Sequence, residues 1–502
     1  MTLSEFQAVL RAHQLIGNDT PDVPGPAGAI TGAAYDSRSV APGHVFFALK
    51  GQRADGATFA RQAIARGAIA VIAEQAAPPD VRAPWIVVTD ARLAMARLAA
   101  AVHDYPSREM QVIGITGTNG KTTTAHVMAS ILEAAGITCG VLGTVSYRIG
   151  DEVREATRTT PEAPDVQHLL REMVDRTCGA CVMEVSSHAL SLARVDGMTF
   201  AAGVFTNLTR DHLDFHADME AYFQAKRRLF DMLTPDAPAV INLDDPRGAS
   251  LIGVGGKPVT YAINRSADIT PGPLSYSLDG LTFDIRTPRG TVHVASKLVG
   301  RPNVYNILAA VSTATALGLP FDAIERGLRA LDGVPGRFQV VSGSADGLTV
   351  VVDYAHTDDA LRNLLETARP LARGRLITVF GCGGDRDRTK RPLMGAVAGR
   401  LSDVIVVTSD NPRSEDPARI IEEIQRGITQ DTRREVGQVF AIVDRREAIA
   451  KAIELARPDD LVLVAGKGHE KFQVIGDRTL PFHDAAVAHE ALARRRANSR
   501  VC

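Results

Sequence analysis

The residues best suited to chemistry form a glycine-rich segment, Gly117 to Thr122 (GTNGKT), between an apolar run at 112–116 and a stretch that favours a helix. A strand, a glycine-rich loop and a helix in this order are the context of a phosphate-binding loop. Glycines let backbone N–H groups approach phosphate oxygens, Lys121 can reach the outer phosphates, and the Thr122 hydroxyl can bind Mg²⁺. A structural turn is the alternative, and Ile115 replaces the small residue of the strict pattern, but the combination favours nucleotide binding.

Two further groups of polar residues follow apolar runs downstream of this segment. Glu184 ends the run at 180–183, so its carboxylate should lie at the C-terminal edge of a neighbouring strand, where ligands of open α/β sheets collect and a second Mg²⁺ ligand is expected. A polar loop follows the run at 203–206, and so many titratable residues in one loop argue against a purely structural role. Its charged and imidazole side chains are Arg210, Asp211, His212, Asp214 and His216.

The length and composition indicate a multidomain protein that acts on small molecules. At roughly 150 residues per domain, 502 residues predict about three domains. Lys and Arg total 56 against 58 Asp and Glu, a net charge of -2, so no global field would attract nucleic acid or an anionic membrane. Five cysteines at irregular spacing make no disulfide framework, and no apolar run approaches the ~20 residues of a membrane span. We therefore expect a cytoplasmic location without membrane insertion.

Short β-branched runs alternate with amphipathic stretches, the pattern of parallel sheets with crossover helices and thus of an α/β fold. We expect three domains, at 1–107, 108–335 and 336–502. Within the second, residues 270–291 favour short strands and turns, which indicates a hairpin insertion. Buried strands of the third domain are expected at 348–352, 376–380, 404–408 and 461–465.

Motifs along nearly the whole chain resemble those of the Mur ligase family. They are GTNGKTT at 117–123, EVSSHAL at 184–190, FTNLTRDHLDFH at 205–216, NVYN at 303–306, GR at 336–337 and DYAH at 353–356. The resemblance implies ATP-dependent amide-bond formation in peptidoglycan synthesis, with ATP and Mg²⁺ as cofactors. It also implies an N-terminal α/β domain that binds UDP, a central phosphate-loop ATPase domain with a mostly parallel sheet, and a C-terminal Rossmann-like domain. A monomer is expected.

The same resemblance implies roles for individual residues. Lys226, which by its position alone would be an exposed helical lysine, would be carbamylated and offer an anionic oxygen to Mg²⁺ or to the γ-phosphate. The implied catalytic residues are Lys121, Glu184, His212, Lys226, Asn303, Arg337 and Asp353. The implied ATP contacts are Gly117, Thr118, Asn119, Gly120, Lys121, Thr122, Thr123, Asn306, Arg337, Asp353 and His356. The implied metal ligands are Thr122, Glu184, His212 and carbamylated Lys226.

The C-terminal motifs GCGGDRDRTKRP at 381–392, DNPR at 410–413 and GKGHE at 466–470 resemble those of family members that add meso-diaminopimelate to UDP-N-acetylmuramoyl-L-alanyl-D-glutamate. Arg413 would bind the distal carboxylate of the added amino acid bidentately, and Glu470 would pair with its distal ammonium. An Asx-Pro turn that caps a helix starting near 417 is a structural alternative for DNPR, and the two roles are compatible. The implied amino-acid contacts are Arg386, Asp410, Asn411, Pro412, Arg413, Gly466 and Glu470.

By the same resemblance, the N-terminal domain and the central domain share the contacts to the UDP-dipeptide. The implied contacts are Tyr35, Ser37, Gln52, Arg53 and Ala54 from the first, and Thr159, Thr160, Ser186 and Arg194 from the second. The chain departs from the family pattern at three positions. Arg158 stands where a well-known version has Asn, Leu192 where some members have Gln, and Asp358 where Pro is frequent.

Two other interpretations are open at this point. A sister ligase, such as folylpolyglutamate synthase or a lysine-adding enzyme, would share the central domain but not the uridine loop together with DNPR. A phosphate-loop switch or nucleic-acid motor would need a basic track with aromatic residues, and the net charge of -2 together with the lack of such a stripe disfavours that class.

Overall fold

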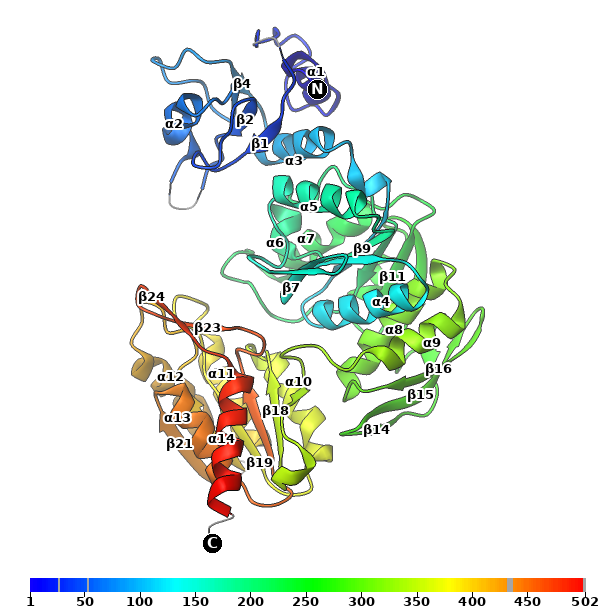
Figure 1. Cartoon of the computed structure of the whole chain (residues 1–502), viewed down its shortest axis with the longest axis vertical. Helices are drawn as coiled ribbons and strands as arrows, with labels where there is room; N and C mark the ends of the chain where they lie inside the picture. The colour runs from blue at the N-terminus through cyan, green and yellow to red at the C-terminus, as the bar shows by residue number, and fades with distance from the viewer. Residues whose placement is uncertain (26–27, 52–53, 431–436, 500–502) are drawn as a thin grey trace.

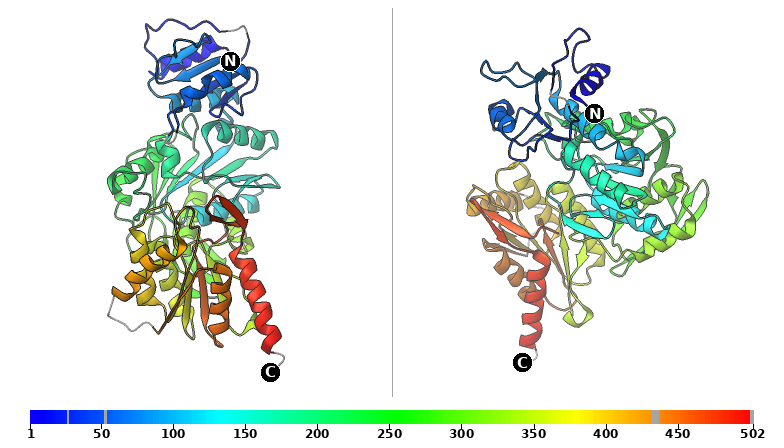
Figure 2. Two further views of the ribbon diagram at one scale, coloured as in Figure 1. Left: turned by 90° about the vertical axis from the view of Figure 1, so that its left-hand side faces the viewer. Right: turned by 45° about the horizontal axis from the view of Figure 1, so that its top comes forward.

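The computed structural model describes residues 1–25, 28–51, 54–430 and 437–499 and contains three α/β bodies that follow one another along the chain (Figure 1). The N-terminal body lies at one end and the C-terminal body at the other, with the central body between them (Figures 1 and 2). Each body has its own sheet with helices packed against it. The predicted α/β fold with three sheet-centred parts is therefore confirmed.

The N-terminal body is built on a four-stranded parallel sheet in the order β1-β2-β3-β4. Its strands are short, and β3 is buried on both faces, as expected for a parallel sheet covered by helices. Its elements are α1 (Leu3–Ala12), β1 (Gly32–Ala34), β2 (His44–Phe47), α2 (Ala60–Ala65), β3 (Ala70–Ala73), β4 (Trp85–Val87) and α3 (Ala91–Val102).

The central body contains an eight-stranded sheet in the order β12-β11-β10-β5-β9-β6-β7-β8, parallel except at β7 and β8. The phosphate-loop segment follows β5, which lies between β10 and β9 in the middle of the sheet. The strands are β5 (Gln111–Thr116), β6 (Cys139–Leu142), β7 (Ser146–Ile149), β8 (Glu152–Glu155), β9 (Ala180–Glu184), β10 (Ala202–Phe205), β11 (Pro238–Asn242) and β12 (Lys257–Tyr261). The helices are α4 (Lys121–Ala134), α5 (Ala163–Asp175), α6 (Ser187–Ser191), α7 (Met219–Asp231), α8 (Arg301–Ala316) and α9 (Phe321–Ala330).

A small antiparallel sheet extends the central body beside α8 and α9 (Figure 1). Its strands are β13 (Thr270–Pro271), β14 (Ser275–Ser277), β15 (Gly280–Thr287) and β16 (Gly290–Ser296). The pair β15 and β16 forms the predicted hairpin, and alternate residues of both strands are buried against the helices. The expected insertion at 270–291 is thus confirmed.

The C-terminal body has a six-stranded sheet in the order β17-β18-β22-β19-β20-β21, parallel except at β17. Helices α10, α11 and α12 cover one face and α13 and α14 the other. The strands are β17 (Gln339–Val340), β18 (Thr349–Asp353), β19 (Leu376–Phe380), β20 (Val404–Thr408), β21 (Gln438–Ile442), β22 (Leu461–Ala465), and the hairpin strands β23 (Phe472–Ile475) and β24 (Arg478–Pro481). The helices are α10 (Asp358–Ala368), α11 (Lys390–Leu401), α12 (Pro417–Gln430), α13 (Arg445–Leu455) and α14 (Asp484–Ser499).

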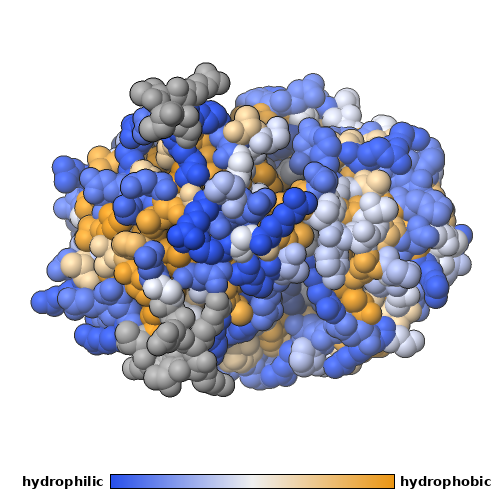
Figure 3. All heavy atoms as spheres, turned by 90° about the horizontal axis from the view of Figure 1, so that it is seen from below, coloured by the Kyte–Doolittle hydropathy of each residue, from blue (hydrophilic) through white to orange (hydrophobic). Residues whose placement is uncertain are grey.

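The surface seen from the C-terminal end mixes polar and apolar residues (Figure 3). Within the described residues, no helix has the length and apolar character needed to cross a membrane.

Candidate functional site

The glycine-rich segment has the backbone geometry of a phosphate-binding loop. Gly117 and Gly120 adopt φ of +147° and +88°, in the left-handed region that favours glycine, and α4 begins at Lys121. A Cβ at Gly117 would lie 1.9 Å from Thr206 Oγ1, and a Cβ at Gly120 would lie 2.4 Å from Asn306 Oδ1. Both glycines are therefore required by backbone angle and by space, and the predicted order of strand, loop and helix is confirmed.

The Thr122 hydroxyl links the central body to the C-terminal body. It donates to Glu184 Oε2 at 3.0 Å and accepts from Arg337 Nη2 at 3.1 Å. Thr144 also holds Glu184, with its N–H 2.8 Å from Oε1 and its hydroxyl 3.1 Å from Oε2. Glu184 is almost fully buried at the end of β9, as its place in the sequence predicts. The structure thus brings Thr122, Glu184 and Arg337 together.

The Lys121 ammonium lies over the phosphate loop. Its Nζ donates to the carbonyl oxygens of Gly117 at 2.9 Å and Thr118 at 2.8 Å. Burial lowers the pKa of Lys121, an effect partly opposed by Glu184 and Asp211. Thr123 is buried in the first turn of α4.

Lys226 is buried, in contrast to the exposed lysine that its position in an amphipathic stretch indicates. Only 2% of the residue is accessible, and its Nζ donates to Gly117 O at 2.7 Å and lies 4.4 Å from the centre of the Tyr222 ring. Tyr222 in turn contacts Thr118 Oγ1 through its hydroxyl at 3.1 Å. Burial lowers the pKa of Lys226 well below its usual value, and the positive charge of Lys121 lowers it further. An amine in this position is biased towards its neutral, nucleophilic form.

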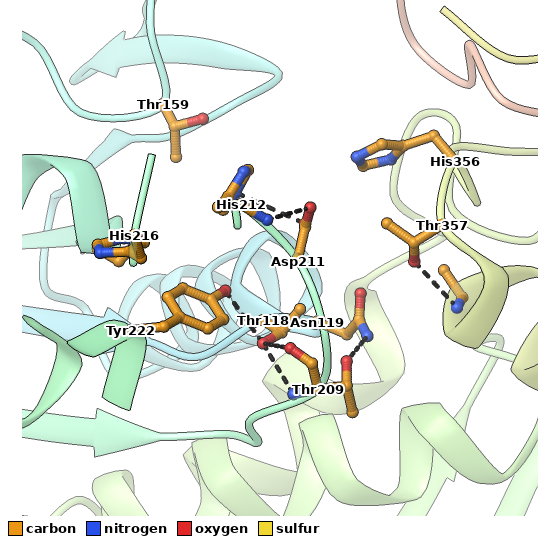
Figure 4. Close-up of polar contacts among 12 residues, drawn as sticks. Thr118, Asn119, Thr159, Thr209, Asp211, His212, His216, Tyr222, His356 and Thr357 are labelled. Atoms are coloured by element: carbon orange, nitrogen blue, oxygen red, sulfur yellow. Dashed lines mark hydrogen bonds and ion pairs between the residues drawn. The ribbon is translucent and has the colours of Figure 1, made fainter. Parts of the chain in front are cut away.

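Two imidazole rings, those of His212 and His216, lie beside the Tyr222 ring (Figure 4). The His188 ring lies 4.8 Å from the His212 ring, and the His216 ring lies 5.0 Å from the Tyr222 ring, between centroids. Burial lowers the pKa of His188 and His212 to about 4, so both rings are neutral at pH 7. His212 has a φ of +55°, and its backbone N–H donates to the Asp211 carboxylate at 2.8 Å.

Other members of the predicted polar loop have different roles. His216 Nε2 lies 3.0 Å from Ser187 Oγ, while Asp214 is exposed. Arg210 reaches the C-terminal body, where its Nη2 donates to Thr389 Oγ1 at 2.6 Å.

The start of the C-terminal body meets the phosphate loop. Asn119 Nδ2 donates to Asp359 Oδ2 at 3.2 Å, in the first turn of α10. Asp353 accepts the N–H groups of Phe338 at 2.7 Å and Ala355 at 2.8 Å, and burial raises its pKa. It therefore joins the residue that follows Arg337 to the loop that follows β18. In Figure 4, His356 from this body faces the region around Asp211 and His212.

The amides of α8 lie behind the phosphate loop. Asn306 Nδ2 donates to Asn303 Oδ1 at 2.9 Å, and Asn303 Nδ2 donates to Val299 O at 2.8 Å. Thr124 Oγ1 lies 3.4 Å from Asn306 Oδ1, which is also the atom closest to Gly120. These two asparagines therefore support the loop from the side of α8.

In the C-terminal body, His356 Nδ1 lies 3.0 Å from Tyr354 O.

Three of the residues expected to contact the dipeptide are close together near Glu184. Thr160 Oγ1 donates to Glu184 O at 2.8 Å and accepts from Ser186 N at 3.1 Å, and Arg194 Nη1 donates to Thr160 O at 3.0 Å. Thr159 lies beside Thr144, with their hydroxyl oxygens 3.1 Å apart.

The N-terminal residues lie further along the same side. Tyr35 donates its hydroxyl to Asp165 Oδ2 at 2.8 Å across the junction with the central body, and Ser37 donates to Gln62 Oε1 at 2.8 Å. Ala54 is exposed. Gln52 and Arg53 lie outside the residues that the structure describes.

Two of the three departures from the family pattern have a local explanation. Arg158 pairs with Glu162, which also binds Arg194 at 2.8 Å. Asp358 is the first residue of α10, where the partial positive charge of the helix N-terminus stabilises a carboxylate. Proline is tolerated at the same position because its missing N–H would have no partner within the helix. Leu192 ends α6, and nothing in the structure explains it.

The DNPR segment is bound to the hairpin strand β23 along its length. Gln473 Nε2 donates to Asp410 O at 2.6 Å, and Val474 N donates to Asn411 Oδ1 at 2.9 Å. Arg413, at a φ of +51°, donates its N–H to Val474 O at 3.1 Å. Because Asn411 Oδ1 is used in this way, the predicted Asx cap is wrong: the Asp416 carboxylate caps α12 by accepting from Ala418 N at 2.9 Å.

The side chains of the expected amino-acid site converge from three loops. Arg413 Nη1 donates to Gly384 O at 2.7 Å. Glu470 Oε2 accepts from Lys467 Nζ at 2.7 Å and from Asn411 Nδ2 at 3.0 Å. A Cβ at Gly466 would lie 2.7 Å from Asp410 Oδ2, so these two loops touch, whereas Arg386 is exposed.

Several residues that hold the site together were not assigned a role from the sequence. Thr144 follows the buried strand β6 as Glu184 follows β9, so the same strand-end signal could have found it. Tyr222 precedes Lys226 at the i,i+4 spacing that places both on one helix face. Lys467 belongs to the GKGHE motif, but no pattern indicates that its side chain is fully buried. Among the described residues, no group of three or more His, Cys, Asp or Glu side chains is arranged to hold a metal ion.

Taken together, a phosphate loop at the centre of a mainly parallel sheet, met by residues of a separate α/β body, defines a nucleotide-dependent enzyme of several domains. Residues 29–103, 115–314 and 336–468 match the Mur ligase family catalytic domain, the Mur ligase middle domain and the Mur ligase glutamate ligase domain, respectively. The chain belongs to the Mur ligase family.

Individual relatives are similar over almost their full length. The UDP-N-acetylmuramoyl-L-alanyl-D-glutamate–2,6-diaminopimelate ligase of Geobacter metallireducens is 50% identical over 91% of this chain and 92% of its own. The ligase of the same name from Gloeobacter violaceus is 48% identical over 97% and 99%. A solved structure of a ligase of this name is 34% identical, covers 99% of both chains and superposes with a TM-score of 0.68. The MurF ligase of Thermotoga maritima, solved with ADP, is 20% identical with a TM-score of 0.59 over 93% of this chain and 96% of its own, which shows the fold alone.

Proposed function

We propose that this chain is an ATP-dependent ligase that adds meso-diaminopimelate to UDP-N-acetylmuramoyl-L-alanyl-D-glutamate, a step of peptidoglycan precursor synthesis. The observation that carries the proposal is the 50% identity with a ligase of this specificity over 91% of the chain. The geometry agrees with it, because the phosphate loop and the buried carboxylate of Glu184 are bonded through Thr122 to Arg337 of the C-terminal body, the body that also carries Arg413.

The first chemical step is transfer of the γ-phosphoryl group of ATP to the γ-carboxylate of the D-glutamyl residue, which gives an acyl phosphate and ADP. Both reactants are anionic, so the step needs neutralisation of charge and in-line placement more than a strong base. Lys121 over the phosphate loop and Arg337 beside Thr122 supply cationic groups. The amino group of diaminopimelate then attacks the acyl carbon, and the amide forms as phosphate leaves.

Thr122 and Glu184 fit Mg²⁺, because a hydroxyl and a carboxylate 3.0 Å apart at the phosphate loop are the hard oxygen donors that this ion prefers. His212 and a carbamate on Lys226 would complete the set. Bound Mg²⁺ would neutralise charge that develops on the phosphoryl oxygens. The depressed pKa of Lys226 supports the carbamate, because carbon dioxide adds to a neutral amine.

Specificity for the added amino acid is assigned to the C-terminal body. Arg413 offers a planar guanidinium to the distal carboxylate, and among the described residues only Gly384 O accepts from its side chain. Glu470 uses Oε2 for Lys467 and Asn411, so Oε1 is left for the distal ammonium. Acyl phosphates hydrolyse in water, which gives the contacts between Asn119, Arg210 and the C-terminal body a function in excluding solvent.

The test is a product assay. Purified chain with ATP, Mg²⁺, the UDP-dipeptide and meso-diaminopimelate should yield one UDP-tripeptide for each ADP, as measured by mass spectrometry. Release of phosphate without UDP-tripeptide would contradict the assignment. L-Lysine in place of diaminopimelate tests the lysine-adding alternative, and a folate substrate with glutamate tests the folylpolyglutamate synthase alternative. A solved folylpolyglutamate synthase from Mycobacterium tuberculosis is 17% identical to this chain, with a TM-score of 0.60, and the match covers 80% of this chain and 95% of that one.

A further inference from the structure

Two loops at the C-terminal edge of the sheet in the C-terminal body are packed directly on each other. Loop 381–388 follows β19, and loop 409–416 follows β20. Gly384 N donates to Asn411 O at 2.9 Å, and a Cβ at Gly384 would lie 1.9 Å from Pro412 O. Each loop carries one arginine of the expected amino-acid site, Arg386 in the first and Arg413, the residue expected to bind the distal carboxylate, in the second. The contact between the loops therefore sets how far apart the backbone positions of these two arginines lie.

A fully buried guanidinium joins the two loops. Arg391, in the first turn of α11, has a side-chain exposure of 0%. Its Nη1 and Nη2 donate to the two carboxylate oxygens of Glu415 at 2.9 and 2.8 Å, and Nη2 also lies 3.2 Å from Gly383 O. Glu415 Oε1 additionally accepts the N–H of Asp385 at 2.6 Å. Thus one ion pair fixes residue 415 of the second loop to residues 383 and 385 of the first.

A second carboxylate, Glu423 on α12, binds the same guanidinium and the end of the first loop, at Arg388, but does not bind the second loop. Its Oε2 lies 2.8 Å from Arg391 Nη1, and its other oxygen accepts from the exposed Arg388. Glu415 and Glu423 therefore offer a matched pair: both neutralise Arg391, and only Glu415 connects the loops.

We propose that Arg391 and Glu415 form a buried clamp that positions Arg386 and Arg413 and so determines the specificity of the site for a distal carboxylate. This inference rests on the proposed function. A bidentate guanidinium–carboxylate pair fixes both distance and plane, which an ammonium at the same place cannot do. A Cβ at Gly383 would lie 2.9 Å from Arg413 Nη1 and 3.9 Å from Arg386 Cγ, so both arginines flank the residue that the clamp holds. Arg391 and Glu415 act as positioning residues, through the two arginines.

The experiment compares Glu415→Gln with Glu423→Gln in the full chain. Because a displacement of ~1 Å can cost up to ~10²-fold, Glu415→Gln should raise the KM for diaminopimelate about tenfold or more, with the KM values for ATP and the UDP-dipeptide and the kcat close to those of the parent. Glu423→Gln should lower the melting temperature by a similar amount but leave the KM for diaminopimelate within about twofold. Asp385 is exposed and also joins the loops, because Ser414 Oγ donates to its Oδ1 at 2.7 Å. Asp385→Asn should therefore raise the same KM by a smaller factor.

Hydrogen exchange gives a readout that needs no substrate. Amides of 383–388 and 410–416 should exchange faster in Glu415→Gln than in Glu423→Gln, whatever amino acid the enzyme uses. An unchanged KM and unchanged exchange in Glu415→Gln, or equal effects of both substitutions, would overturn the clamp. A parent enzyme that does not add diaminopimelate would instead refute the proposed function, and the exchange result would still decide on the clamp.

Discussion

Replacement of Lys226 by Met should separate catalysis from stability. The side chain is 2% accessible, and its Nζ lies 2.7 Å from Gly117 O and 4.4 Å from the centre of the Tyr222 ring. Methionine is similar in length, apolar and adaptable, so it should fill the same space. We expect the variant to lose ligase activity, because no carbamate can form, yet to be more stable than the parent near pH 7.

The gain in stability follows from the depressed pKa of Lys226. The folded state binds this proton less well than the unfolded state, so the lysine opposes folding below its unfolded pKa of about 10.4, and stability rises as pH increases towards that value. Linkage limits this cost at pH 7 to ~1.36 kcal/mol for each pH unit between 7 and the unfolded pKa. The substitution loses one hydrogen bond worth about 1 kcal/mol, and Gly117 O keeps its bond from Lys121. The variant should therefore be more stable than the parent at pH 7, by this cost less that of the lost hydrogen bond.

The assay is denaturant unfolding of both proteins at pH 7, 8 and 9, in buffer freed of carbon dioxide and metal ions. The gain of the Met variant should shrink as the pH rises, by at most about 1.4 kcal/mol for each unit of pH. A Lys226→Ala protein provides the second arm, because short carboxylates such as formate should partly restore its ligase activity. A Met variant with full activity would remove Lys226 from the mechanism, and a variant less stable than the parent at pH 7 would refute the argument from burial.

Three further predictions address the nucleotide site and the effect of pH. Gly117→Ala should abolish nucleotide binding in a titration, because its Cβ would lie 1.9 Å from Thr206 Oγ1 at a φ of +147°; normal binding would show that the loop does not need this backbone. Glu184→Gln should raise the Mg²⁺ concentration required for half-maximal rate at least tenfold, because the amide keeps the shape of the carboxylate but loses its charge. Chelation of Mg²⁺ should abolish the rate of the parent. An unchanged Mg²⁺ concentration for half-maximal rate in the variant would exclude Glu184 as a ligand. Burial lowers the pKa of His126, on α4, to about 4, so the unfolded state binds more protons than the folded state between pH ~6.5 and ~4. The free energy of unfolding should therefore fall on acidification through this window. His126→Gln should reduce this dependence on pH, and an unaltered dependence would contradict the assignment.

Continuous apolar runs were enough to predict the buried parallel strands. The runs at 376–380, 404–408 and 461–465 coincide with β19, β20 and β22, because strands covered on both faces need apolar side chains at every position. The strands β7, β8 and β17 could not be predicted in this way, since they lie at or next to sheet edges, where polar and apolar residues are mixed. Sheet order also depends on contacts distant in sequence and is not contained in a local pattern.

The site was predictable where a side chain stands at a strand end or in a glycine-rich loop. Glu184 and the loop at 117–122 are of this kind, and the structure brings them together. The burial of Lys226 was not, because the helical pattern around it indicates an exposed lysine, and only the packing of α7 against the phosphate loop removes it from solvent. The contacts of Arg391 could not be predicted from the sequence either, since its partners Glu415 and Glu423 are 24 and 32 residues away along the chain.

The measurement that tests the central claim most directly is the ratio of kcat/KM for meso-diaminopimelate to that for L-lysine, in the parent and in Arg413→Met. A charged bidentate pair contributes about 1.5 to 3 kcal/mol, so the parent should prefer diaminopimelate and the variant should lose at least about tenfold of that preference through diaminopimelate alone. An Arg413→Met enzyme that discriminates as well as the parent would contradict the recognition of the distal carboxylate by this guanidinium.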